Sequence, residues 1–575
     1  MDLSLRWSQL ARRRLCELHD SNAFQRENCI RDGDLRDELD HELAELHVLV
    51  NLAKSVRNTM VAISVLPPEI LSAIFERCAE NEPMLPPRRC LIPTESLGWV
   101  KITHVCRYWR DTALDHQALW ATISFSLPQW TQELVVRSRS APVILEYSAT
   151  DGHLLPPIRQ IREVGAQCTS RISRIHLRMS ETDLTHLVPL ILCRMPLLKS
   201  LILESTGGFT LLGDIQALSS YWNLALNQLH LNAPNLEQIA IRAPIALPWN
   251  SPIFRNLTRL EVDYPELELV VNRRLCPPLP LVIQTLREMQ NIRMLSLQNA
   301  VSIPSDGTDT GCGPPVHLHH LELLRLAGPL SSVAPCVEHI LVPFSTVLDI
   351  SINRPSYYPS PTDHNSSLLL PLLNKRLVGE DSELRPWRSV KMTMTSDDMH
   401  TTETWFDQQS FATTPDPALS CTLTVPVSGN MPYGCISKGL IRQYPGENLR
   451  SISLCQAIPD WYLDSSKYLG TMNDLEEIEV VGEAFAEDCL LQTFLALHPS
   501  CPTLCTVTIR SNRISLPLAE AYTRAFKACF SSTPLPILRI VDCTVHRSWL
   551  ESLRQMGYVE DLQWDGNERI EHTIE

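Results

Sequence analysis

A short spacing pattern of aliphatic residues recurs along most of the chain and limits its fold more than any other feature. An aliphatic residue is followed by two others, an aliphatic residue, one other and a further aliphatic residue. The clear copies are ISRIHL (172–177), LKSLIL (198–203), LEQIAI (236–241), LTRLEV (257–262), IRMLSL (292–297), LELLRL (321–326), LRSISL (449–454), LEEIEV (475–480), LCTVTI (504–509) and VEDLQW (559–564). Weaker copies lie near residues 347 and 387. Alternation within each copy predicts a short strand, and most copies are about 20–40 residues apart.

Amphipathic stretches lie between several of these predicted strands. They are DLTHLVPLILCRM, LVIQTLREM, EDCLLQTFLALH, LAEAYTRAFKACF and SWLESLRQM. A strand and its helix leave one apolar face uncovered, so successive units must stack to bury it. The pattern therefore predicts an α/β fold in which N-terminal helices precede an irregular leucine-rich-repeat solenoid. Its sheet is expected to be curved and largely parallel, with helices on the convex side.

Polar residues between the aliphatic positions are expected to point outward along the concave sheet. The candidates for substrate binding there are Arg242, Glu261, Gln298, Arg325, Glu479 and Arg510. The alternative is a solvated strand face that binds nothing. Three polar intervals, at 302–315, 353–367 and roughly 394–418, are predicted to be loops.

Length and charge narrow the class of protein. A chain of 575 residues exceeds one hydrophobic core, and 44% apolar with 20% charged residues is typical of folded chains. The net charge of −15 disfavours binding to nucleic acid or to anionic membranes. Neither a signal peptide nor an uninterrupted apolar span is found. Eighteen cysteines without a CxxC pair indicate reduced thiols and a cytoplasmic or nuclear location.

A helix is predicted over residues 35–57. Leu39, Leu43, Leu46, Val50 and Ala53 follow each other at spacings of four and three, which places them along one helix face. Two interpretations remain: a helix folded against its own protein, or a short coiled coil that dimerises. The expected domains are an N-terminal helical segment (1–60), a helical domain (61–125), a connector (126–168) and the repeat region (169–575).

The segment from 66 to 123 predicts a small helical domain with a partly shared apolar surface. Proline at 67 or 68 suits the start of a helix, and Glu69 suits its positive end. A second helix is predicted over WVKITHVCRYWRDTAL, with one face formed by Ile102, Val105, Cys106, Trp109 and Ala113. So small a core leaves two interpretations, in which the apolar surface meets a partner or packs against the rest of the chain.

These residues resemble the F-box motif, whose pattern is Leu-Pro, an acidic residue, an aliphatic run, Val-Cys-Arg-x-Trp-Arg and a closing Leu-Trp. The matching positions are Leu66, Pro67, Glu69, Ile70, Leu71, Ile74, Phe75, Val105, Cys106, Arg107, Trp109, Leu119 and Trp120. The interval between the two helices, about residues 79–98, is longer than the usual connection. The overall plan is similar to that of many fungal F-box proteins.

The resemblance implies a substrate receptor of a Skp–cullin–F-box ubiquitin ligase with no active site of its own. The F-box would bind the Skp adaptor, and through it a cullin, while the repeat region would bind a protein substrate. The alternative is an interaction scaffold that uses the same modules without ubiquitin transfer. An enzyme with a diffuse active site is a further alternative.

Catalytic signatures that a sequence can reveal are missing. The chain has no GxxxxGK[ST] loop and no GxSxG elbow, and HELAE at 41–45 lacks the second histidine of a zinc helix. HLHH at 317–320 begins a predicted strand, where alternate side chains face opposite ways. We therefore expect no metal, no cofactor and no enzymatic activity.

Overall fold

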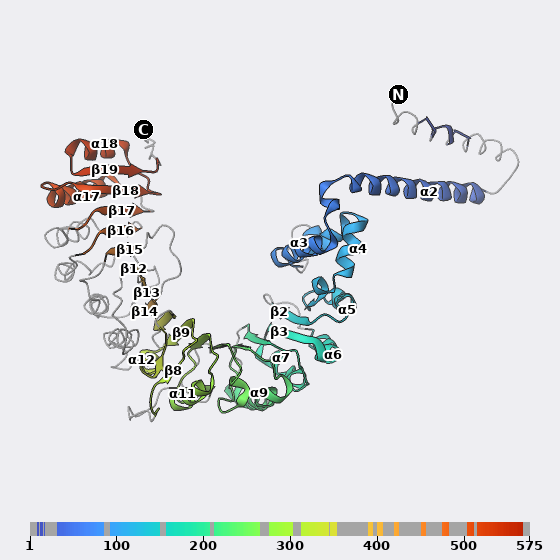
Figure 1. Ribbon diagram of the computed structural model, residues 1–575, viewed down its shortest axis with the longest axis horizontal. Helices are drawn as coiled ribbons and strands as arrows, with labels where there is room; N and C mark the ends of the chain where they lie inside the picture. Colours follow the sequence, from blue (N-terminus) through green and yellow to red (C-terminus); the bar gives the residue numbers. More distant parts are fainter. Residues whose placement is uncertain are drawn as a thin grey trace. The chain divides into compact units, whose positions relative to one another are not determined.

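The computed structural model of the chain has two compact units. It describes residues 9–10, 12–14, 16–17, 32–84, 93–149, 157–206, 212–264, 275–302, 312–343, 346–352, 389–394, 399–405, 419–424, 450–455, 474–481, 503–510 and 514–566. Met1–Thr122 and Gln129–Ala141 form one unit, called the helical unit here. Ile123–Pro128 and Pro142–Glu575 form the other, called the sheet unit (Figure 1).

The helical unit contains the predicted helical domain and the long helix that precedes it. Its elements are α2 (Asp32–Thr59), η1 (Ala62–Val65), α3 (Pro68–Asn81), η3 (Pro93–His104), α4 (Arg107–Asp115), η4 (Gln117–Trp120) and most of α5 (Pro128–Arg137). Helices α3 and α4 pack against each other and against η3 and η4. The core of this unit lies where they meet.

The predicted N-terminal helix is confirmed and is longer than expected. Helix α2 has 28 residues, and its described apolar side chains are not packed into the core. Leu43, Leu46 and Val50 of the predicted apolar seam are 51%, 47% and 49% exposed. The described part of this helix therefore gives no support to the interpretation that the seam folds against its own chain.

The sheet unit is built on one extended, largely parallel sheet. Its strands are β1 (Thr122–Ser124), β2 (Val143–Ser148), β3 (Ile172–Met179), β4 (Ser200–Ser205), β5 (Gln238–Arg242), β6 (Arg259–Asp263), β7 (Met294–Gln298), β9 (Leu323–Gly328), β11 (Val347–Ile352), β12 (Ser389–Met394), β13 (Met399–Trp405), β14 (Leu419–Thr424), β15 (Ser451–Cys455), β16 (Glu477–Val481), β17 (Thr506–Arg510), β18 (Leu535–Val541) and β19 (Val559–Trp564). A separate parallel pair is formed by β8 (Val316–His317) and β10 (Ile340–Leu341).

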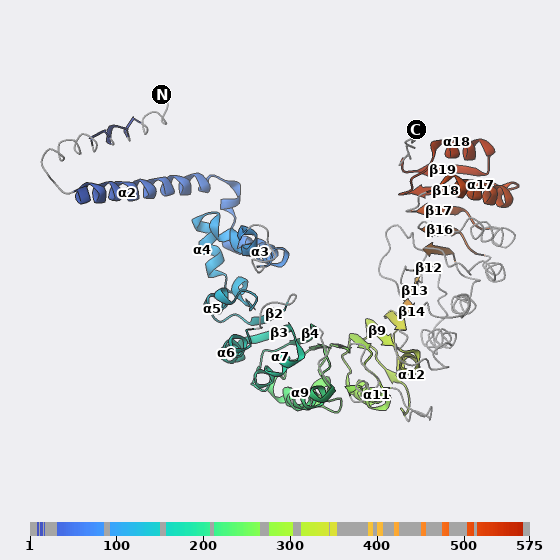
Figure 2. The same ribbon diagram turned by 180° about the vertical axis from the view of Figure 1, so that it is seen from behind.

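Neighbouring strands in the sheet are mostly neighbours in the chain. Strands β2 to β7 pair in order, β7 pairs with β9 and β9 with β11, all in parallel. Strands β15 to β19 also pair in order and in parallel. Figure 2 shows β16 to β19 following one another at the C-terminal end of the sheet. Between these runs the order is β11, β14, β13, β12, β15, and both pairings of β13 are antiparallel.

Helices and short turns connect the strands. They are α6 (Ile158–Cys168), η5 (Thr169–Arg171), α7 (Glu181–Thr185), α8 (Val188–Ile191), α9 (Leu212–Asn232), η6 (Pro252–Phe254), α11 (Leu279–Glu288), α12 (Leu330–His339), α17 (Leu516–Phe530) and α18 (Arg547–Met556). The stretch predicted as one helix at 183–195 is divided between α7 and α8. The stretch EDCLLQTFLALH lies outside the described residues.

The aliphatic positions of the sequence pattern form continuous rows on one face of the sheet. The two rows of the first parallel run are Ile175, Leu201, Ile239, Leu260, Leu295, Leu324 and Leu348, and beside them Leu177, Leu203, Ile241, Val262, Leu297, Leu326 and Ile350. All of these side chains are buried. The prediction that the pattern forms strands with their aliphatic residues in the core is confirmed for these strands.

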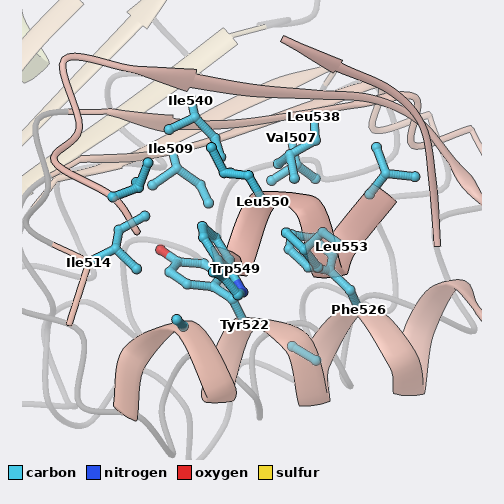
Figure 3. Close-up of a cluster of buried hydrophobic side chains, with 14 of the residues drawn as sticks. Val507, Ile509, Ile514, Tyr522, Phe526, Leu538, Ile540, Trp549, Leu550 and Leu553 are labelled. Carbon is cyan, nitrogen blue, oxygen red and sulfur yellow. The ribbon is translucent and has the colours of Figure 1, made fainter. Parts of the chain in front are cut away.

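The core at the C-terminal end shows how helices complete this burial (Figure 3). Tyr522 and Phe526 of α17 and Trp549 of α18 lie between the helices and the strands that carry Val507 and Ile540. Trp549 Nε1 donates a hydrogen bond to Thr523 Oγ1 at 3.0 Å, which satisfies its polar atom inside the apolar cluster. Gly557, at φ 69°, ends α18 in the left-handed conformation and returns the chain to β19.

Two sequence expectations differ from the structure of the sheet unit. Strand β2 lies within residues 126–168, the segment expected to be a connector, and its Val143, Leu145 and Tyr147 are buried in strict alternation. The interval at roughly 394–418, expected to be a loop, contains β13. Its threonine-rich sequence is polar, yet β-branched threonine fits a pleated strand. The other two predicted loops lie mainly outside the described residues.

The opposite face of the sheet, called the polar face here, carries ion pairs that cross between strands. Arg242 of β5 bridges two carboxylates: its Nη1 lies 2.7 Å from Glu204 Oε1 and its Nη2 lies 2.8 Å from Glu261 Oε2. Arg259 also pairs with Glu261. Burial alone would raise the pKa of the Glu261 carboxyl. Hydrogen bonds and charges from Arg259 and Arg242 outweigh this effect, so its pKa lies below the ordinary value.

We expect Glu261→Gln to lower the free energy of unfolding of the sheet unit by about 1–3 kcal/mol at pH 7, because two arginines lose their shared charged acceptor. A lowered pKa stabilises the fold above the unfolded-state value of about 4.3. The difference in the free energy of unfolding between variant and wild type should therefore persist down to about that pH. It should narrow as the pH approaches the pKa of Glu261 in the folded state.

Thermal or denaturant unfolding of both proteins at several pH values measures this difference. Glu237→Gln is the matched control. Glu237 is 52% exposed, and its Oε1 lies 3.7 Å from Nζ of Lys199. Equal stabilities of wild type and Glu261→Gln at pH 7 would show that the charge network contributes nothing.

Candidate functional site

The two prolines before α3 set the start of the helix that carries most candidate residues. Pro67 is the N-cap and Pro68 the first helical residue, as the sequence predicts. The Pro67 carbonyl accepts hydrogen bonds from the amides of Ile70 and Leu71 at 3.1 Å each. Proline loses nothing at this position, because the first amides of a helix have no acceptor within it. The helix therefore begins at one defined residue.

Helix α3 has two distinct apolar faces. Leu71 and Phe75 are completely buried in the helical unit. Ile70 and Ile74, each one residue earlier, are 49% and 37% exposed. Because residues four apart lie on the same side of a helix, Ile70 and Ile74 form an exposed pair. The helix thus presents an outer apolar face while an inner face holds it in place.

The inner face is fixed by aromatic contacts. The ring of Phe75 lies 5.3 Å from that of Trp109, and the rings of Trp99 and Trp120 meet edge to face at 4.9 Å. Trp120 Nε1 donates a hydrogen bond to the Ala113 carbonyl at 2.8 Å. The closing tryptophan is thus buried without an unsatisfied polar atom, and it anchors η4 to α4.

The second predicted helix is divided in two. Strandlike φ and ψ angles at Cys106 separate η3 from α4, and its Sγ accepts a hydrogen bond from the Trp109 amide at 3.4 Å. Cys106 therefore caps α4 instead of lying inside a helix. Val105, just before the cap, is 57% exposed, whereas Ile102 and Ala113 are buried. The expectation that these three share one face with Cys106 and Trp109 is wrong, because the break in the helix at Cys106 redirects Val105.

The two ends of the long interval between the helices lie next to each other. The Trp99 amide donates a hydrogen bond to the Glu82 carbonyl at 2.8 Å, which ties η3 to the end of α3. Gly98 has φ 52°, and a Cβ there would lie 2.6 Å from the Glu82 oxygen. A side chain would block this close approach, so glycine is needed here.

A groove lies between helices α3 and α4. Its volume is about 610 Å³, and its lining includes the carboxylates of Glu69, Glu76, Asp111 and Asp115. His116 Nε2 lies 2.8 Å from Glu76 Oε1 at the edge of the groove. Its chemistry suits cationic side chains.

The structure divides the candidate F-box residues into three groups. Pro67, Glu69, Ile70, Ile74 and Val105 are exposed; Leu66, Cys106 and Trp109 are half-buried; Leu71, Phe75, Leu119 and Trp120 are buried. The first group can contact a partner directly. The last group supports the fold.

Sequence reasoning missed several residues that complete this surface. Val65 of η1 is 78% exposed just before α3. Tyr108 Oη donates a hydrogen bond to the Leu66 carbonyl at 2.8 Å and so ties α4 to the start of α3. Arg137 of α5 lies 4.2 Å above the Trp120 ring. Tyr108 lies within the quoted motif, but no spacing rule assigns it this contact.

The candidate substrate-binding residues all lie on strands of the sheet unit, but they are not equally accessible. Arg242 is exposed, and Gln298, Arg325 and Arg510 are half-buried. Glu261 and Glu479 are buried, which corrects the expectation that they point freely to solvent. Arg510 Nε lies 2.8 Å from Glu479 Oε1, so this glutamate holds its arginine as Glu261 holds Arg242.

The described residues bear on three further features: a metal site, a reactive thiol and a membrane-spanning helix. Within those ranges no three His, Cys, Asp or Glu side chains gather as a metal site. The rings of His317 and His319 stack with centroids 5.7 Å apart. Burial raises the pKa of the Cys276 thiol to about 12, so it is no thiolate nucleophile at neutral pH. None of the described helices has the length and hydrophobicity to cross a membrane.

Comparison with known proteins identifies the segment that carries this surface. Residues 63–126 match the family model described as F-box-like. No curated protein sequence matches the chain significantly. F-box domains bind Skp-type adaptors and are typically non-catalytic modules. The match supports an F-box protein whose adaptor-binding module extends from η1 to just beyond β1.

Proposed function

We propose that the chain is a substrate receptor of a Skp–cullin–F-box ubiquitin ligase. One observation carries this proposal: the F-box-like segment presents Ile70 and Ile74 to solvent on a helix whose other face is locked into the core. Exposed aliphatic side chains on a rigid helix are typical of an interface with another protein. The adaptor would cover this face and link the chain to a cullin.

The sheet unit is the proposed substrate-binding part. Two runs of parallel strands, β2 to β11 and β15 to β19, support an irregular leucine-rich-repeat solenoid. We assign the substrate surface to the polar face. There Arg242, Arg325 and Arg510 are the candidate contacts, while Glu261 and Glu479 position Arg242 and Arg510. Arg325 is held by Asp349, with 2.6 Å between Nε and Oδ2.

The mechanism is one of effective concentration. A receptor of this kind holds its substrate close to a ubiquitin-charged enzyme, so that transfer becomes quasi-intramolecular. The chain needs no catalytic group for this role, and it would act in the cytoplasm or nucleus. The alternative, a scaffold without ubiquitin transfer, uses the same two surfaces and differs in the fate of the bound protein.

Ile70→Lys combined with Ile74→Lys should weaken co-purification of the adaptor by about tenfold or more. In the complex the adaptor would bury both isoleucines, so each lysine would place a desolvated charge in the interface. The helical unit should remain folded, because both positions are exposed. Binding to a purified Skp-type adaptor measures the effect. Val136→Lys is the matched control: Val136 is 61% exposed in the same unit but lies outside the matched segment. Undiminished adaptor binding by the double variant would contradict the assignment.

Leu71→Ala should instead act through folding. Removing this fully buried side chain is expected to destabilise the helical unit by about 2–5 kcal/mol. Hydrogen exchange should show increased opening of η1 to η4 and no change in the sheet unit. Protection equal to that of the wild type in η1 to η4 would show that Leu71 is not part of a cooperative core.

Proximity labelling in cells distinguishes the receptor from the scaffold. With the wild-type chain, labelled substrates should increase when the proteasome is inhibited. With the Ile70→Lys, Ile74→Lys variant they should already be abundant without inhibitor. Labelled proteins whose abundance responds to neither change would favour the scaffold.

A further inference from the structure

Helix α2 carries an apolar stripe that the described part of the chain leaves exposed. Leu43, Leu46, Val50 and Ala53 follow at spacings of three, four and three, so they form one narrow line along the helix. Leu49 and Val56 widen this line on one flank and are 52% and 51% exposed. Exposed apolar surface of this extent on a helix is typical of a face that packs against a partner.

The spacing is that of a coiled-coil seam. In a heptad labelled a to g, Leu43 and Val50 occupy a positions, and Leu46 and Ala53 occupy d positions. The helix has 28 residues, so it offers four heptads, or about 42 Å of length. Within it the apolar a and d positions run from Leu39 to Ala53, which is about two heptads.

We propose that α2 pairs with α2 of a second copy of this chain as an antiparallel coiled coil centred near Val48. In this register Leu46 of one copy lies against Val50 of the other, and Leu43 lies against Ala53. A second copy is the partner that this stripe fits, because the charges beside it are complementary to those of the same helix reversed.

The flanking charges argue for this partner. Asp40, His47 and Lys54 all occupy e positions, and all three are exposed. In an antiparallel pair e positions face e positions, so Asp40 of each copy lies opposite Lys54 of the other. Two symmetric pairs of opposite charge result. In a parallel pair e positions face g positions, and Lys54 would lie opposite Leu49 instead.

Arg57 also favours the antiparallel arrangement. It occupies an a position and is exposed. A parallel dimer would oppose Arg57 to its own copy in the seam, where like charges repel at close range. An antiparallel dimer opposes a to d positions and places the two arginines at opposite ends. Leu49, at a g position, then meets Leu49 of the second copy.

The Arg14 side chain does not cover the stripe. Its Nη2 lies 2.7 Å from Glu42 Oε1 in an ion pair at a g position. Leu43 and Leu46, on the adjoining seam, remain about half exposed with this pair in place. The second copy can therefore occupy the seam while Arg14 stays where it is.

Light scattering of the full-length chain over a concentration series tests the dimer. We expect Leu46→Lys to raise the dimer dissociation constant at least tenfold, because the charge falls in the middle of the seam. Val48→Lys is the matched control: Val48 is 61% exposed at an f position on the opposite side of the helix, so its dimer should be unchanged. A wild-type chain that stays monomeric, or a dimer that Leu46→Lys leaves intact, overturns the proposal.

Charge reversal tests the orientation. Asp40→Lys and Lys54→Asp should each weaken the dimer, by about threefold to tenfold at low salt for the two symmetric pairs. The double variant should recover to within about twofold of the wild type, because it restores both pairs. Additive losses in the double variant would exclude the antiparallel pairing. Since none of these residues lies in the F-box-like segment, adaptor binding by each variant should equal that of the wild type.

Discussion

The sheet unit depends on the burial of its aliphatic rows. Each strand supplies side chains such as Ile239 and Ile241 to one face, where the strand on either side extends the same rows. Each fully buried aliphatic side chain contributes about 1.5–3 kcal/mol relative to exposure. A single strand of five residues could not retain that gain, because half of its apolar surface would meet water. The order of strands in the sheet follows from this need for neighbours.

The polar face lies on the side of the sheet opposite the aliphatic rows, and it is constrained by the charges on adjacent strands. In-register parallel strands bring equivalent positions within reach of each other, so charges on adjacent strands must alternate in sign or repel. Glu204 and Arg242 satisfy this rule on β4 and β5, and Arg242 also reaches Glu261 of β6, which is in register with Ala240. The buried glutamates thus hold extended arginine side chains in fixed positions. A partner that binds there would meet guanidinium groups already ordered, which reduces the entropy lost on binding.

Periodicity predicted the strands whose aliphatic spacing is regular. It did not predict features that depend on other patterns or on contacts between distant segments. Strand β18 fits the pattern at Leu535, Leu538 and Ile540 but was not among the predicted strands. Strand β2 has simple alternation without the leading aliphatic residue, so the pattern could not include it. The reversed order of β12 to β14 has no signature in spacing, because strand pairing is set by contacts between distant segments.

The outer apolar face of α3 shows the same limit of sequence-based prediction at single residues. Ile70 and Leu71 are adjacent, similar in size and equally typical of the motif, yet one is half exposed and the other is buried. Only the position of α4 and η3 against α3 decides which side is inner. Likewise the break at Cys106 depends on a local sulfur cap within a stretch whose apolar spacing is typical of a continuous helix.

The Trp99 amide is hydrogen-bonded to the Glu82 carbonyl, so the geometry of the helices does not depend on the length of the segment between these two residues. Both ends of that segment are fixed by the folded core, so a change in its length need not move α3 or α4. Closure entropy rises by only about 0.6 kcal/mol for each doubling of loop length. This point of the chain is therefore open to evolutionary drift in length, and it offers a place to graft a reporter peptide or fluorophore.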